Sequence, residues 1–170
     1  MDPESLSRPE SQEISIKSVQ SPEEVAMAKS LFQEYLGTLA PDSDLSEYEQ
    51  ELQNMPGEYT PPYGFLLLVC IDGHLAGCGA VRALENCDYM NACEMRRLYV
   101  RPAFRRFGVG QALVEALLER ARAIGYSVMV LDTLDEMQIA RELYTSFGFE
   151  EIPPYYYDPV PGACHLKLDL

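Results

Sequence analysis

The stretch of this chain that decides its fold reads Leu98-Tyr99-Val100-Arg101-Pro102-Ala103-Phe104-Arg105-Arg106-Phe107-Gly108-Val109-Gly110. Its first residues end a predicted strand, its arginines fall in a loop, and its two glycines stand where a helix begins. The first turn of a helix presents unpaired backbone N–H groups and the positive end of the helix dipole, so it binds phosphate readily. Glycine lets the backbone approach a pyrophosphate closely, and arginine adds charge-assisted donors. The stretch predicts an anion site; the alternative is an ordinary glycine-rich turn.

Two well-known phosphate loops fit this stretch poorly. A Walker loop needs a lysine followed by serine or threonine after its second glycine, and neither is present. A dinucleotide-binding fingerprint needs a third glycine at Leu113, although Asp132 does end the next predicted strand, as a ribose-binding acid would. The loop also follows four predicted strands instead of opening the sheet. The stretch therefore favours neither of these two nucleotide-binding sites.

Around this stretch, hydrophobic periodicity predicts seven strands and four helices. We expect strands over 13–19, 65–71, 75–84, 92–100, 128–131, 149–157 and 163–169. We expect helices from Ser21 to Gly37, Asp42 to Met55, Val109 to Ile124 and Ile139 to Phe147. This order predicts an α/β (α+β) fold with one mixed sheet and helices on its faces.

Short local motifs mark several of these boundaries. Ser21-Pro22-Glu23-Glu24 combines a serine at the N-cap, a proline at the first helical position and a glutamate at the third, which is typical of a helix start. Gly125 and Gly148 are expected to end the last two helices. Asp72-Gly73 lies between two apolar runs and is a strong hairpin signal; the alternative is a slightly longer loop through His74.

Length and composition indicate one globular domain. The chain has 170 residues, close to the ~150 typical of a domain, and we expect the domain to span 13–170. Residues 1–12, rich in Ser, Pro and Glu, are expected to form a disordered leader. The longest strictly apolar run, Phe65–Ile71, is far shorter than the ~20 residues that cross a bilayer. The N-terminus has no apolar signal-peptide core, so we expect a cytoplasmic protein without a membrane partner.

The charge of the chain is strongly negative but unevenly distributed. A formal net charge of −14 repels nucleic acid and anionic membranes, so we expect no nucleic-acid partner. Against this background, residues 96–106 contain five arginines and no acid. This cluster is either a solvated basic face or a local anion site, and the glycines that follow it favour the anion site.

Cysteine and histidine give no metal pattern. The chain has five cysteines without C-x-x-C spacing and two histidines, whereas a zinc site needs paired ligands at close spacing. An odd cysteine count without a secretion signal suggests reduced thiols, so we expect no metal and no disulfide. No cysteine is assigned a nucleophilic role, because no histidine partner can be argued for one.

Two motifs together resemble the GNAT superfamily of N-acetyltransferases. Arg105–Gly110 fits its coenzyme A pyrophosphate signature, Q/R-x-x-G-x-G/A, and Ala140–Phe149 fits its A-x-x-L-Y-x-x-x-G-F motif. The strand order agrees, so the resemblance covers roughly 13–170. It implies a single-domain, mostly antiparallel seven-stranded sheet with about four helices, splayed between the fourth and fifth strands. It also implies acetyl transfer from acetyl-coenzyme A, by direct attack in a ternary complex, to a primary amine of a small-molecule or amino-acid-like acceptor.

The resemblance implies a role for each matching residue. Backbone groups of Leu98 and Val100 would pair with the pantetheine arm, and an N–H of the splayed strand, that of Leu98, would polarise the thioester carbonyl. Met137 replaces an asparagine that contacts the cofactor arm in many members, so that amide contact is missing. The implied cofactor-binding residues are Leu98, Tyr99, Val100, Arg105, Arg106, Phe107, Gly108, Val109, Gly110, Gln111, Met137, Ala140 and Tyr144.

Such a reaction needs one group that takes a proton from the amine and one group that protonates the leaving thiolate. Tyr144 matches the family's tyrosine that protonates the leaving thiolate; the alternative is a packed aromatic on an amphipathic helix. Glu94 lies on the strand that faces the substrate, where it is a candidate general base, directly or through water. The alternative for Glu94 is an ion pair with Arg96 or Arg97.

The acceptor is not identified by these motifs. The acidic segment 42–51 would attract a cationic amine, or it is simply a solvated helix face. Tyr155-Tyr156-Tyr157 would border an amine site through cation–π contact, or it is an aromatic edge strand. Two other functions stay open: a non-catalytic coenzyme A-binding regulatory module, and a protein N-terminal or lysine acetyltransferase. Monomer and homodimer are both compatible with the sequence.

Overall fold

A computed structural model describes residues 13–38, 45–105, 107–134, 137–155 and 162–170. The described chain forms a seven-stranded sheet in the order β1-β2-β3-β4-β5-β7-β6, and only β4 and β5 pair in parallel. The strands are β1 (Ile14–Ser18), β2 (Phe65–Ile71), β3 (His74–Leu84), β4 (Ala92–Val100), β5 (Val128–Leu134), β6 (Glu150–Ile152) and β7 (Ala163–Asp169). The helices are α1 (Pro22–Leu36), α2 (Ser46–Asn54), α3 (Val109–Ile124), α4 (Gln138–Ser146) and the 3-10 turn η1 (Pro102–Phe104). The predicted mixed, mostly antiparallel sheet is confirmed.

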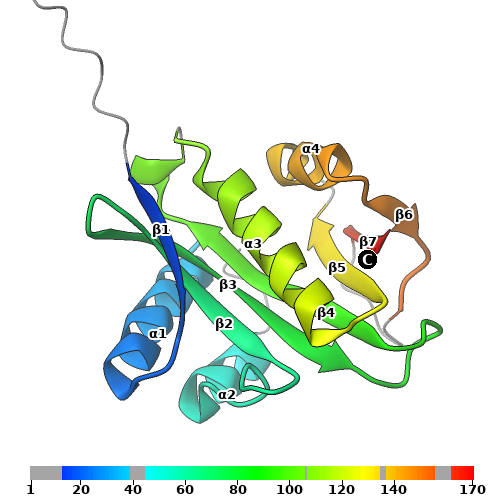
Figure 1. The fold of residues 1–170 in the computed structure, drawn as a ribbon, viewed down its shortest axis with the longest axis horizontal. Coiled ribbons are helices and arrows are strands. Elements are labelled where there is room, and N and C mark those ends of the chain that lie inside the picture. The colour runs from blue at the N-terminus through cyan, green and yellow to red at the C-terminus, as the bar shows by residue number, and fades with distance from the viewer. Residues whose placement is uncertain (1–12, 39–44, 106, 135–136, 156–161) are drawn as a thin grey trace, which may run out of the picture.

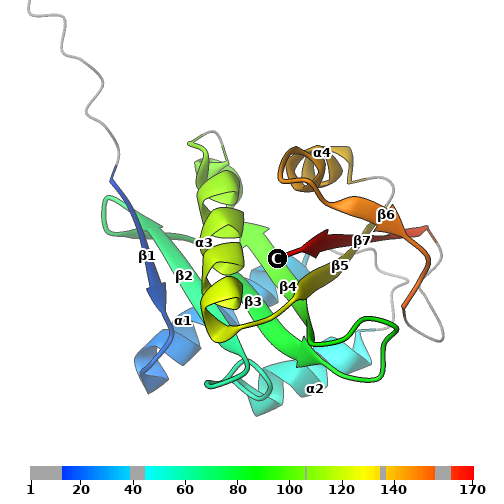
Figure 2. The ribbon, with the colours of Figure 1, turned by 45° about the vertical axis from the view of Figure 1, so that its right-hand side comes forward.

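The helices cover both faces of the sheet (Figures 1 and 2). α3 packs on one face, where Leu113 and Leu117 contact a core that includes Val69 and Met129. α1 packs on the opposite face, where Leu31 and other α1 residues contact the smaller core of β2 and β3. Successive strand residues point to opposite faces, so each strand supplies both cores. We call the side of the sheet that carries α1 and α2 the α2 face.

Local motifs set several boundaries as expected. The Ser21 hydroxyl accepts from the Glu24 N–H at 3.2 Å and the Glu24 carboxylate accepts from the Ser21 N–H at 3.2 Å, which completes a capping box. Asp72 and Gly73 have φ values of 49° and 83° between the paired residues Ile71 and His74, the geometry of a two-residue hairpin.

Other boundaries differ from the prediction. β5 runs to Leu134 instead of ending at residue 131, because β7 pairs with it along that whole length. β6 ends at Ile152, well short of the predicted 157; Pro153 and Pro154 follow it and have no N–H to donate to a ladder. α2 begins at Ser46 rather than Asp42, and residues 42–44, like the predicted leader 1–12, lie outside the described residues.

No described helix combines the length and apolar character needed to cross a membrane. Within the same described ranges, no group of three or more His, Cys, Asp or Glu side chains is placed to hold a metal ion. All five cysteines are free thiols.

Candidate active site

β4 and β5 diverge and leave an opening in the sheet. They pair only from Ala92 to Glu94 against Val128 to Val130. Beyond these pairs β4 stays with β3, while β5 stays with β7 as far as Leu134. The expected splay between the fourth and fifth strands is therefore confirmed. The residues that line the opening are Tyr35, Tyr48, Met95, Arg96, Arg97, Leu98, Leu131, Asp132, Thr133, Met137, Ala140 and Tyr144.

A β-bulge bends β4 beside this opening. Ala80 pairs with Arg96 and Cys78 with Tyr99, so Gly79 alone lies opposite two residues of β4. Arg97 in the bulge has φ 58°, in the left-handed region that residues other than glycine rarely adopt. The bulge interrupts the alternation of side chains, and Arg96 and Arg97 both reach Glu51 of α2 on the same face. Sequence periodicity alone would have placed them on opposite faces.

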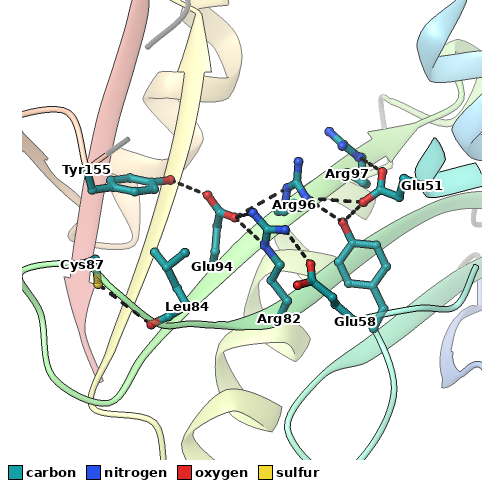
Figure 3. A network of polar contacts seen from close by, with 10 residues as sticks. Glu51, Glu58, Arg82, Leu84, Cys87, Glu94, Arg96, Arg97 and Tyr155 are labelled. Carbon is teal, nitrogen blue, oxygen red and sulfur yellow. Dashed lines mark hydrogen bonds and ion pairs between the residues drawn. The ribbon is translucent and has the colours of Figure 1, made fainter. Parts of the chain in front are cut away.

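Glu51 gathers the two arginines and a tyrosine (Figure 3). Arg97 Nε donates to Glu51 at 2.6 Å, and Arg96 Nη1 lies 3.4 Å from the same carboxylate. The Tyr59 hydroxyl also donates to Glu51. The Arg97 guanidinium carbon lies 3.9 Å from the ring centroid of Tyr48, a stacked cation–π contact. The acidic helix therefore uses Glu51 to hold arginines of β4.

Glu94 is fully buried in a second charged cluster (Figure 3). Arg82 approaches its carboxylate through Nε and Nη2, both at 2.9 Å, and Arg96 Nε lies 3.6 Å away. The Tyr155 hydroxyl donates to its other oxygen at 2.8 Å. The expected ion-pair alternative for Glu94 is thus realised with Arg96 and also with Arg82, a partner that the sequence did not indicate. Its role as general base stays a prediction.

The described arginines of the 96–106 cluster have separate partners within the protein. Arg96 and Arg97 pair with carboxylates, and Arg101 Nε pairs with Glu34 of α1 at 2.9 Å. Arg105 Nε donates to the Val100 carbonyl at 2.9 Å, which folds it back over the end of β4. Arg106 lies outside the described residues. The anion site that the sequence indicated for this cluster stays a prediction.

The glycine-rich loop ends in the helix that was expected. Gly108 caps α3 with φ 69°, a conformation that favours glycine, and a Cβ built there meets no atom within 4 Å. Val109 is buried, whereas Phe107 and Gln111 are exposed. Gly110 lies against Leu143 of α4. The start of this sixteen-residue helix is therefore open to a ligand, as a phosphate site requires.

The remaining implied cofactor residues gather around the opening. Leu98, Met137 and Ala140 line it together with Tyr144. The Tyr99 side chain points instead to α1, where its ring lies 6.1 Å from that of Tyr35. Two predicted acceptor residues, Tyr156 and Tyr157, lie outside the described residues.

Tyr144 is a buried tyrosine that lines the opening. Its side chain is buried, and its ring packs edge-on against Phe149 at 5.8 Å. Burial is the main cause that raises the pKa of Tyr144, and Tyr35 and Asp132 raise it further. The phenol therefore stays protonated through the physiological range.

Asp132 is a site residue that sequence reasoning considered only as a ribose ligand. It follows the last β4–β5 pair and lies opposite His165 of β7. Partial desolvation raises the pKa of Asp132, as does Glu94, while His165 and Arg96 lower it. The signal was a carboxylate directly after the apolar run of β5, but only the splay shows that it borders the opening.

Comparison with known proteins agrees with this geometry. The acetyltransferase (GNAT) family model matches residues 26–149. An uncharacterized N-acetyltransferase of Schizosaccharomyces pombe is 40% identical over 157 residues, covering 92% of this chain and 95% of that protein. N-acetylaspartate synthetase of Xenopus tropicalis is 31% identical over 127 residues, covering 75% of this chain and 44% of that protein.

Solved structures share the fold. An acetyltransferase of Streptococcus agalactiae superposes with a TM-score of 0.75 at 17% identity, covering 92% of this chain and 98% of that one. The protein yncA of Salmonella typhimurium, determined with its cofactor acetyl-CoA, superposes with a TM-score of 0.67 at 18% identity, covering 92% and 94%. At these identities the likeness concerns the fold alone.

Proposed function

The chain belongs to the acetyltransferase (GNAT) family, and we propose that it transfers the acetyl group of acetyl-coenzyme A to the primary amine of a small, amino-acid-like acceptor by direct attack in a ternary complex. Family membership makes it an acyltransferase. The observation that carries the proposal is that one opening brings together the bulged strand, Tyr144 and Asp132, beside the helix that Gly108 begins. The N-acetylaspartate synthetases in the comparison are named for an acetylated amino acid, which supports an acceptor of that class.

The residues present fit acetyl-coenzyme A. Space around Gly108 and the first turn of α3 suit the pyrophosphate, with Arg105 at the end of β4. Leu98 lies in the bulge and lines the opening, where its N–H would polarise the thioester carbonyl. Met137 and Ala140 would border the cofactor arm through apolar contact. When bound, acetyl-coenzyme A supplies an activated acetyl group and a thiolate leaving group.

The chain's own residues would move two protons. Tyr144 is protonated and buried beside the opening, so it would protonate the departing sulfur. A carboxylate would take the proton of the acceptor's ammonium. Glu94 is the candidate that the sequence indicated; it does not itself line the opening, but it contacts Arg96, which does. Asp132 borders the opening directly.

A thermal-shift experiment tests cofactor binding. Acetyl-coenzyme A at ~100 times its dissociation constant should stabilise the chain by ~2.7 kcal/mol, a rise of roughly 5–10 °C, and ATP or NADH should not. Gly108→Glu should lose this shift, because a carboxylate would occupy the pyrophosphate position. Gly73→Glu is the matched control, since Gly73 also has a positive φ and open space but lies in a remote hairpin.

Turnover tests the transfer itself. Release of free coenzyme A thiol, followed with a panel of primary amines, should depend on both the amine and acetyl-coenzyme A. Binding of acetyl-coenzyme A without transfer to any amine would instead support a regulatory coenzyme A-binding module. A shift with ATP or NADH in place of acetyl-coenzyme A would contradict the proposal altogether. The 13–170 domain boundary and the cytoplasmic location stay predictions.

A further inference from the structure

The two edges of the opening carry opposite charges. On the β4 edge, Arg96 and Arg97 contribute two guanidinium groups, and on the β5 edge Asp132 contributes one carboxylate. The other residues that line the opening are aromatic, apolar or, in the case of Thr133, a neutral alcohol. On a chain with a net charge of −14, a pair of cations at this place needs an explanation.

One edge of the Arg97 guanidinium makes no hydrogen bond within the described parts of the chain. Its side chain is only 7% exposed, and burial without hydrogen bonds is costly for a charged group. Nε donates to Glu51, and one flat face lies over Tyr48. Its two outer nitrogens have no hydrogen-bond partner within the described parts of the chain, and Figure 3 shows them pointing away from Glu51. This outer edge has the planar, two-pronged geometry that matches a carboxylate.

Glu51 alone does not neutralise the two arginines. It is shared among Arg97, Arg96 and the Tyr59 hydroxyl, while Arg96 reaches Glu94 only at 3.6 Å. Arg96 Nη2 has no partner within the described chain either. One further anion on this edge would complete the hydrogen bonds of both guanidinium groups.

We propose that the acceptor is an amino acid with a free carboxylate, which the outer edge of Arg97 binds with Arg96 beside it, while Asp132 receives the ammonium group. This inference rests on the proposed function and narrows its acceptor class. It disfavours polyamines, lysine side chains and peptide N-termini, since none of them brings a carboxylate close to the reacting amine. Both groups act from the α2 face, opposite the side from which α4 supplies Tyr144.

The step balances with groups already named. Asp132 takes one proton from the ammonium, and the neutral nitrogen forms a C–N bond to the acetyl carbon. The C–S bond breaks with its electron pair on sulfur, which takes the Tyr144 proton. The nitrogen of the new amide still carries two hydrogens and gives one of them, through water, to the Tyr144 phenolate, while Asp132 releases its proton to water. The net products are therefore the N-acetyl amino acid, coenzyme A and one proton. The carboxylate of the acceptor is unchanged and serves only to place the nitrogen.

Matched acceptor pairs provide the test. The rate of thiol release is measured with L-aspartate and L-alanine, with the α-carboxamide of each of these amino acids, and with putrescine. The acids should exceed their amides by about 100-fold in kcat/KM, because the amide lacks the charge that pairs with Arg97. Amides or putrescine that react as well as the acids would overturn the inference while leaving the proposed function intact.

Variants of Arg97 test whether this residue binds the carboxylate of the acceptor. Arg97→Gln should lower kcat/KM for the acids by about 100-fold and leave kcat/KM for the amides nearly unchanged. For Arg97→Lys, kcat/KM for the acids should lie between those of the wild type and Arg97→Gln, because lysine keeps the charge but lacks the two-pronged guanidinium. The KM of acetyl-coenzyme A should not change in either. Arg101→Gln is the control, since Arg101 pairs with Glu34 and does not line the opening. Equal losses for acids and amides in Arg97→Gln would overturn the assignment.

Failure of transfer is separated from failure of this inference by calorimetry. If no amine is acetylated, L-aspartate is titrated into the wild type and Arg97→Lys in the presence of coenzyme A. Binding to the wild type that weakens in the variant supports the carboxylate site even though the proposed function has failed. No binding of L-aspartate to the wild type, together with no transfer, overturns both.

Discussion

Arg97 Nε lies 2.6 Å from Glu51 Oε2, although the two residues are 46 positions apart in the chain. The contact joins the bulge of β4 to α2 at the edge of the opening. The Arg97 guanidinium also stacks on Tyr48, and Arg97 lines the opening. One ion pair therefore connects the packing of α2 with the chemistry of the site.

Glu51→Gln should destabilise the fold. Removing one partner of a buried pair leaves charge without compensation, and because glutamine keeps one acceptor oxygen we expect a loss of about 2 kcal/mol in the free energy of unfolding. Urea unfolding at pH 7 measures it. Glu49→Gln is the matched control on the same helix, exposed to solvent, and should stay within about 0.5 kcal/mol of the wild type. Equal effects of both variants would mean that the Arg97–Glu51 contact does not hold α2.

Tyr144→Phe should lower kcat by about 100-fold and leave the KM of acetyl-coenzyme A nearly unchanged, because phenylalanine keeps the packing against Phe149 but has no proton to give. Steady-state thiol release measures both constants. Tyr63→Phe, at an exposed tyrosine, serves as the control. Full turnover by Tyr144→Phe would remove this residue from the mechanism.

The pH dependence of kcat/KM should reflect the protonation of Asp132. Only its deprotonated form accepts a proton, so kcat/KM should fall as the pH falls through the Asp132 pKa. Desolvation and Glu94 raise that pKa above the usual 3.8 of an aspartate, so the acid limb should lie above this value. Asp132→Asn should lower kcat by about 100-fold or more and remove the limb.

Glu94→Gln is the comparison that separates the two carboxylates. If Asp132 is the base, Glu94→Gln changes stability through Arg82 and Arg96 but keeps the acid limb. An acid limb that survives in Asp132→Asn and vanishes in Glu94→Gln would return the general-base role to Glu94, as the sequence indicated.

Glu24 should make the capping box of α1 pH-dependent. The Gln20 backbone N–H, then Lys17, lower the pKa of Glu24 below its ordinary 4.5. A lowered folded-state pKa contributes stability above the unfolded value and loses it as the pH falls through the folded value. The stability difference between the wild type and Glu24→Gln should therefore be constant near pH 7 and shrink below about pH 4.5.

Urea unfolding across this pH range tests the Glu24 prediction, with Glu23→Gln as the neighbour that takes no part in the box. A difference that does not change with pH would mean that the carboxylate charge adds nothing to the cap.

Where a signal lay within a few residues, the sequence predicted the structure closely. The capping box at Ser21, the hairpin at Asp72-Gly73 and the glycine start of α3 each depend on backbone geometry and hydrogen bonds between near neighbours. β4 and α3 begin and end where they were expected. The strand after α4 was predicted too long, because Pro153 and Pro154 follow Ile152 and have no N–H to donate to a ladder.

The sequence by itself determined the order of strands and helices and the family to which the chain belongs, because both follow from local periodicity and from two short motifs. The tertiary structure decided what the charged side chains do. A one-residue bulge opposite Gly79 brought Arg97 to the same face as Arg96, and α2 then supplied Glu51. The divergence of β4 from β5 made Asp132 a border of the site and left Glu94 buried behind it. Such partners depend on strand register and packing between segments far apart in the chain, and no local pattern encodes them.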